Sequence, residues 1–123
     1  MEKEKLFLYR LFASLYRCGI RQIDIGSEDL KKIMPYLKQT IGDEIKDIED
    51  LFNVDEEGIY TNYLKMISSL DPLCVERENN VVNFIMNDEM SNFFNDDNIN
   101  YIGEKVAAYI KVKKKEKSFY ENN

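Results

Sequence analysis

The sequence predicts a mostly helical α+β fold in which a short strand and a β-hairpin lie between helices. Three observations predict it. Apolar residues recur at helical spacing over several stretches, and two strand-like runs flank an Asn-Asn pair at residues 79–80. Glycine and proline residues separate these stretches from one another. Together they give the order helix, short strand, helices, β-hairpin and C-terminal helix.

One domain is expected because a chain of 123 residues can bury one core but is too short for two. Hydrophobic residues make up 44% of the chain and charged residues 33%, so burial can offset the entropy of folding. We place the domain at residues 1–112. Residues 113–123, with the run Lys-Lys-Lys-Glu-Lys, are predicted to form a basic, frayed tail.

The first two elements are a helix over residues 2–18 and a short strand over residues 20–25. The helix follows from an apolar stripe at positions i, i+3, i+4 and i+7, made by Leu8, Leu11, Phe12 and Leu15. Gly19 supplies the stop. The strand follows from partial alternation and β-branched residues.

A second helix is predicted over residues 28–41. Ser27 is its expected N-cap, and Glu28 and Asp29 in the first turn complement the helix dipole. Pro35 is expected to kink or divide this helix, because proline lacks an N–H and clashes with the preceding turn.

Two further helices are predicted in the middle of the chain, over residues 43–52 and 59–70, with a loop over residues 53–58. The first carries Ile45, Ile48, Leu51 and Phe52. The second carries Ile59, Tyr60, Tyr63, Leu64, Ile67 and Leu70, and it ends before Pro72.

The hairpin is the clearest local signal. Asparagine tolerates positive φ, so Asn-Asn at residues 79–80 predicts a two-residue turn. That turn pairs Val75 with Phe84, and it turns Glu76 and Asn83 outward together. One face then holds five apolar side chains: Leu73, Val75, Val82, Phe84 and Met86.

The C-terminal part is predicted to hold a short helical turn within residues 87–97 and a last helix capped by Asn98. The apolar stripe of that helix is Ile99, Ile102, Val106, Tyr109 and Ile110.

This order of elements, with one helix added, resembles the winged-helix superfamily over about residues 4–86. The resemblance implies a recognition helix at residues 59–70 and a wing tip at residues 79–80. DNA reading usually needs Arg, Lys, Asn or Gln, and the predicted recognition helix offers only Asn62 and Lys65 of these types. Its surface therefore suits a protein partner better than a DNA duplex.

The composition argues against enzymatic function. The chain has no histidine, which removes the commonest general base and zinc ligand, and no other catalytic motif replaces it. Cys18 and Cys74 fit no metal or redox spacing and are expected to be buried thiols. We expect no enzyme activity, no cofactor and no metal site.

Charge is distributed unevenly along the chain. Residues 1–22 carry five basic and two acidic groups, residues 23–104 carry six and nineteen, and residues 105–123 carry six and two. The acidic middle repels phosphates and disfavours nucleic acid as a partner. The sequence contains no membrane-spanning run and no signal-peptide pattern at its start, so we expect a cytoplasmic protein without membrane contact.

Three groups of side chains are candidates for contacting a partner. They are the basic Lys3, Arg10, Arg17 and Arg21, the acidic Asp55, Glu56 and Glu57, and the tyrosines Tyr60 and Tyr63. The basic set could bind phosphates or acids, the acidic set could cover a basic surface, and tyrosines are favoured at interfaces. The simpler interpretation is that these side chains face water, pair within the domain or belong to its core.

Three functions follow as hypotheses. The preferred one is a non-enzymatic interaction or assembly subunit that docks to another protein, or to itself, through its helical surfaces. The alternatives are a winged-helix DNA-binding regulator and an acidic inhibitor or immunity-type protein that covers a basic partner.

Overall fold

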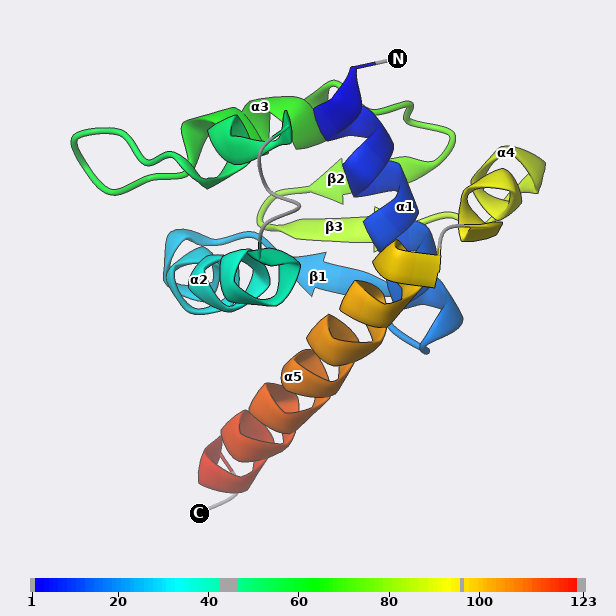
Figure 1. The fold of residues 1–123 in the computed structure, drawn as a ribbon. Coiled ribbons are helices and arrows are strands. Elements are labelled where there is room, and N and C mark those ends of the chain that lie inside the picture. The colour runs from blue at the N-terminus through cyan, green and yellow to red at the C-terminus, as the bar shows by residue number, and fades with distance from the viewer. Residues whose placement is uncertain (1, 43–46, 96, 122–123) are drawn as a thin grey trace.

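The structure, a computed structural model, describes residues 2–42, 47–95 and 97–121 (Figure 1). The predicted α+β class and the order of its elements are confirmed. The α-helices are α1 (Lys3–Arg17), α2 (Ser27–Ile41), α3 (Thr61–Ser68), α4 (Asp88–Ser91) and α5 (Asp97–Glu121). The strands are β1 (Gln22–Asp24), β2 (Val75–Glu78) and β3 (Val81–Phe84), and two 3₁₀-helices are η2 (Glu49–Phe52) and η3 (Asn92–Asn95).

The three strands form one antiparallel sheet in the order β1-β3-β2. Strand β3 is central, because it pairs with its hairpin partner β2 and also with β1. The predicted register is confirmed: Val75 lies opposite Phe84 and Glu76 lies opposite Asn83. Of the two turn residues, Asn79 adopts a positive φ of 54°.

The predicted buried face of the hairpin is correct for three residues and wrong for Leu73. Val75, Val82 and Phe84 are buried and Met86 is half-buried, whereas the Leu73 side chain is 70% exposed. The reason is that β2 begins only at Val75. Leu73 lies in the preceding turn, where its N–H donates to the Asp71 carboxylate at 2.9 Å.

Helix α1 forms the centre of the core. It packs between the sheet and α5 (Figure 1), and Leu8, Phe12 and Leu15 on it are buried. The Phe12 ring stacks on Phe84 with the ring centroids 4.7 Å apart, which joins α1 to the central strand. The buried side chains form one continuous cluster.

Helix α2 corrects two predictions. It begins at Ser27, so Gly26 and not Ser27 occupies the N-cap position. Of the two effects expected of Pro35, a kink or a division, the division is wrong, since one α-helix runs through that position. Pro35 is exposed, so water can reach the carbonyl that loses its hydrogen bond there, while Met34 and Leu37 beside it are buried.

Helix α5 is longer than predicted. It begins at Asp97, one residue before the expected cap Asn98, and it continues to Glu121. Residues 113–121 are therefore helical, where a frayed tail was predicted. With 25 residues the helix is about 37 Å long, and its C-terminal half extends away from the sheet (Figure 1).

The predicted helix over residues 43–52 is present only in part. Residues 43–46, with Ile45, lie outside the described residues, and Glu49–Phe52 form the 3₁₀-helix η2. Its expected apolar residues Ile48, Leu51 and Phe52 are buried. The helical turn predicted within residues 87–97 is confirmed by α4 and η3.

Candidate functional site

A groove of about 590 Å³ lies between α2, α5 and β1. We call it the α2–α5 groove. Its apolar lining comes from four elements: Leu11, Phe12 and Leu15 of α1, Ile23 of β1, Leu30, Ile33, Met34 and Leu37 of α2, and Val106 and Ile110 of α5. Its size falls within the range of protein binding pockets.

Two tyrosines hold the walls of the groove together. The rings of Tyr36 on α2 and Tyr109 on α5 stack with centroids 4.4 Å apart. The Tyr109 hydroxyl donates to the Lys32 backbone carbonyl, and the Tyr36 hydroxyl donates to the Lys105 carbonyl, each at 3.4 Å. These contacts fix the separation of α2 and α5, so the groove exists before any partner binds.

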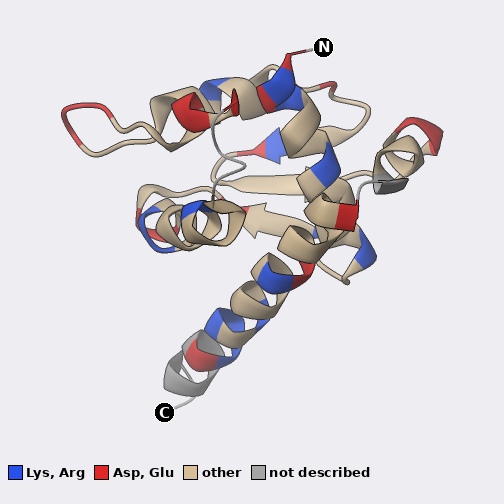
Figure 2. Ribbon diagram, viewed as in Figure 1, with Lys and Arg blue, Asp and Glu red and all other residues tan. Residues whose placement is uncertain are grey.

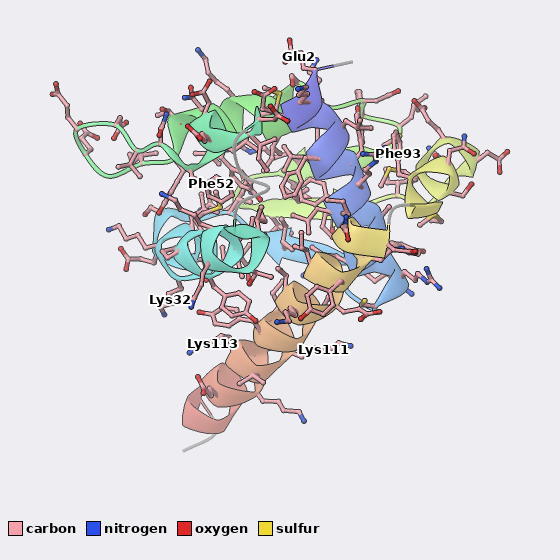
Figure 3. All side chains as sticks on the ribbon, viewed as in Figure 1. Glu2, Lys32, Phe52, Phe93, Lys111 and Lys113 are labelled. Carbon is pink, nitrogen blue, oxygen red and sulfur yellow. The ribbon has the colours of Figure 1, made fainter. Side chains whose placement is uncertain are left out.

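Charged side chains of both signs surround the apolar lining. They are Asp24, Asp29, Lys32, Lys113, Lys114 and Glu116. Figure 3 shows Lys32 on α2 and Lys113 on α5 at the same side of the molecule. Lys113 pairs with Glu116 at 3.4 Å. The other four make no salt bridge with any residue that the structure describes, so their charges are open to a partner.

Tyr63 is the one predicted site residue that lines the groove. Its side chain is only 3% exposed, and burial raises the pKa of its hydroxyl, so the hydroxyl stays protonated at neutral pH. Within the described part of the chain, no group hydrogen-bonds to this hydroxyl. Tyr60, just before α3, is half-buried and packs against the core.

The predicted basic residues do not line the groove, and at least two of them contact groups of the chain itself. Lys3 pairs with Asp47 at 3.2 Å. The Arg21 guanidinium lies 3.8 Å from the centroid of the Tyr16 ring and also donates to the Tyr16 carbonyl. Arg17 is exposed, and Arg10 is half-buried on α1.

The predicted acidic residues lie on the loop before α3, which is far from the basic end of α5 (Figure 2). The Asp55 carboxylate accepts from the N–H groups of Glu57 at 2.8 Å and Ile59 at 3.0 Å, so it orders the loop. Glu56 and Glu57 are exposed. They place negative charge next to the helix that the winged-helix resemblance assigns to DNA reading.

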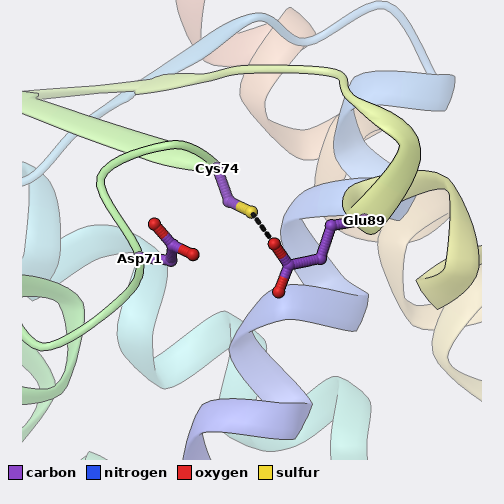
Figure 4. A group of neighbouring side chains, drawn as sticks. All are labelled: Asp71, Cys74 and Glu89. Atoms are coloured by element: carbon purple, nitrogen blue, oxygen red, sulfur yellow. Dashed lines mark hydrogen bonds between the residues drawn. The ribbon is translucent and has the colours of Figure 1, made fainter.

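A second group of chemically interesting side chains is Asp71, Cys74 and Glu89, whose ligand atoms lie within 4.8 Å of one another (Figure 4). The Cys74 thiol donates to Glu89 Oε2 at 3.7 Å. Burial raises the pKa of this thiol, and the nearby Glu89 and Asp71 carboxylates raise it further. Cys74 therefore retains its proton at neutral pH.

Sequence reasoning missed both the groove and this group. Their members come from distant parts of the chain, and none of them belongs to a motif of fixed spacing. Comparison with known proteins finds no matching family, no similar curated protein and no similar solved structure. Among the described residues, no helix combines the length and apolar character needed to cross a membrane.

Proposed function

We propose that this chain is a non-enzymatic interaction protein that binds a segment of another protein in the α2–α5 groove. The observation that carries the proposal is the groove itself, with an apolar floor, a width fixed by the Tyr36–Tyr109 stack and charged side chains at its rim. Peptide segments bind to such grooves by burying apolar side chains, while charged groups at the rim select the partner.

The rim favours a polypeptide over a simple charged metabolite. Two cations, Lys32 and Lys114, and two anions, Asp24 and Asp29, belong to one groove and form no salt bridge within the described residues. A polypeptide can supply both signs of charge along its length together with apolar side chains. A small ligand with one sign of charge would pair with only one of these two sets of side chains.

A negative charge introduced into the apolar lining of the groove should strongly weaken binding of the partner. Ile33→Glu and Ile110→Glu each put a carboxylate at a half-buried lining position, where a bound partner would bury it. We expect each to lower recovery of the partner by about tenfold or more, since an unpaired buried charge costs several kcal/mol. The measurement is affinity capture from host lysate with quantitative mass spectrometry, repeated by calorimetry with the recovered protein.

Two exposed apolar positions outside the groove give matched controls. Val112 is 53% exposed and Leu73 is 70% exposed, and neither lines the groove. Val112→Glu and Leu73→Glu should therefore bind the partner like the wild type, and all four variants should keep the helical circular dichroism signal. Equal recovery by groove variants and controls would contradict the proposed function.

Duplex DNA is expected to bind weakly or not at all. Thr61, Asn62 and Lys65 of α3 are exposed, and the loop just before this helix carries Glu56 and Glu57. We expect no measurable binding to a random 30-base-pair duplex by fluorescence anisotropy at roughly 50 mM salt, because repulsion opposes phosphate contact. Tight binding that weakens steeply between about 50 and 200 mM salt would support the DNA-binding alternative instead.

A further inference from the structure

Strand β1 is an edge strand with an open side. Two hydrogen bonds flank its pairing with β3: the Phe84 N–H donates to the Arg21 carbonyl at 2.9 Å, and the Ile25 N–H donates to the Asn80 carbonyl at 2.8 Å. In an antiparallel ladder, residues that form hydrogen bonds with the partner strand alternate with residues that do not. Since Arg21 and Ile25 form such bonds, the residue midway between them also does. That residue is Ile23, opposite Val82.

The backbone groups of Gln22 and Asp24 therefore point away from β3. Each residue contributes one N–H and one carbonyl to the open side, and no hydrogen bond joins these groups to another described residue. Gln22, Ile23 and Asp24 all line the α2–α5 groove. The strand that contributes one wall of the groove thus carries a row of backbone donors and acceptors on its open side.

We infer that the partner segment is extended and adds to the open side of β1 as a fourth strand. This inference rests on the proposed function and specifies its partner. A strand can satisfy the free backbone groups of Gln22 and Asp24, whereas a helix cannot, because its own backbone groups are already paired. The open edge of β1 thus recognises the backbone of the partner segment.

The side chains of β1 specify the chemistry of the added strand. Ile23 is half-buried and packs against the core, so the residue beside it must be apolar. Gln22 and Asp24 are exposed on the opposite face, and the Asp24 carboxylate has no salt-bridge partner among the described residues. The segment that fits alternates apolar residues with Lys or Arg, which places a cation beside Asp24.

A short peptide tests the inference directly. The probe is acetyl-Thr-Val-Lys-Val-Lys-Val-Thr-amide with a fluorescent label, and its affinity is measured by anisotropy. We expect saturable binding, and competition between the probe and the partner recovered by affinity capture. A peptide of the same composition in the order Lys-Lys-Val-Val-Val-Thr-Thr lacks the alternation and should bind at least about tenfold more weakly.

Backbone methylation separates strand addition from any other mode of binding. Successive amides of a strand point to opposite sides, so N-methyl groups on both lysines and on two valines block opposite edges. One set should weaken binding by about tenfold or more, and the other set should leave it nearly unchanged. Which of the two sets weakens binding also shows whether the added strand runs parallel or antiparallel to β1. Equal effects of both sets, or no binding of the unmethylated probe, would overturn the inference.

The protein side offers a matched pair of variants. Asp24→Pro removes an N–H that points away from β3 and leaves the Ile23 bonds to β3 in place, whereas Asp24→Asn keeps that N–H. Asp24→Pro should bind the probe about fivefold or more weakly than Asp24→Asn, with both variants folded by circular dichroism. Equal binding would overturn the inference, and the methylated peptides decide the matter if Asp24→Pro fails to fold.

Failure of this inference can be told from failure of the proposed function. If Ile110→Glu abolishes capture of the partner while Asp24→Pro and the methylated peptides have no specific effect, the groove binds its partner without strand addition. If Ile33→Glu and Ile110→Glu leave capture unchanged, the proposed function itself is wrong.

Discussion

Phe84→Ala should lower the free energy of unfolding by about 3–5 kcal/mol. The Phe84 side chain is 6% exposed and stacks on Phe12 where α1 packs against the central strand. Its removal loses buried apolar surface and leaves a cavity that the fixed backbones of α1 and β3 cannot close. Urea denaturation followed by circular dichroism measures the change, which should appear as a lower midpoint with an unchanged slope.

The neighbouring position provides the control. Asn83 lies opposite Glu76, on the other face of the same strand, and its side chain is partly exposed. Asn83→Thr should change the free energy of unfolding by no more than about 0.5 kcal/mol, because threonine suits a strand and no core contact is lost. If Phe84→Ala were harmless and Asn83→Thr unfolded the protein, the two faces of the hairpin would be reversed.

The parts of the fold that local patterns determine could be predicted from the sequence. The hairpin register follows from a two-residue turn and the alternation beside it, so Val75 and Phe84 were paired correctly. Helix α1 follows from its apolar stripe and the stop at Gly19. Leu73 was misplaced because the alternation continues in the sequence beyond the point where the Asp71 turn ends the strand.

Features that depend on tertiary contacts could not be predicted. Strand β1 pairs with β3, which lies about sixty residues later in the chain. The sequence of a three-residue strand does not determine which other strand it pairs with. Pro35 suggested a break in α2 because the sequence does not show that buried neighbours hold the helix together. The lysine-rich run after residue 112 suggested a frayed tail, but the helix begun at Asp97 continues through it.

The candidate site was the least predictable part. Sequence reasoning selected a set of basic residues on and just after the first helix, but it could not show that Asp47 pairs with Lys3 or that the Tyr16 ring lies against Arg21. Tyr63 was selected as an interface tyrosine, and its buried side chain is part of the groove lining. The groove requires α2 and α5 to meet through Tyr36 and Tyr109, a contact over more than seventy residues that no short pattern records.

The tight contact between α1 and α5 leads to the second large stability effect. Gly103 lies against Ser14, a buried residue of α1, and a Cβ added at Gly103 would lie 2.5 Å from the Ser14 Cβ and closer still to its hydroxyl oxygen. Gly103→Ala would gain about 1 kcal/mol from helix propensity. We expect the clash to outweigh this gain and to give a net loss of about 2–3 kcal/mol in the free energy of unfolding, because two packed helices must move apart.

Two second-site changes test whether Ser14 is the cause. Ser14→Gly removes both atoms that clash, so the double variant Ser14→Gly/Gly103→Ala should recover at least about 1 kcal/mol relative to the sum of the single changes. Ser14→Ala removes only the hydroxyl and keeps the Cβ at 2.5 Å, so it should recover much less. A double-mutant cycle from urea midpoints measures both couplings. Additive single effects would show that α1 and α5 are not in contact at Gly103, and the helix that forms one wall of the groove would then be misplaced.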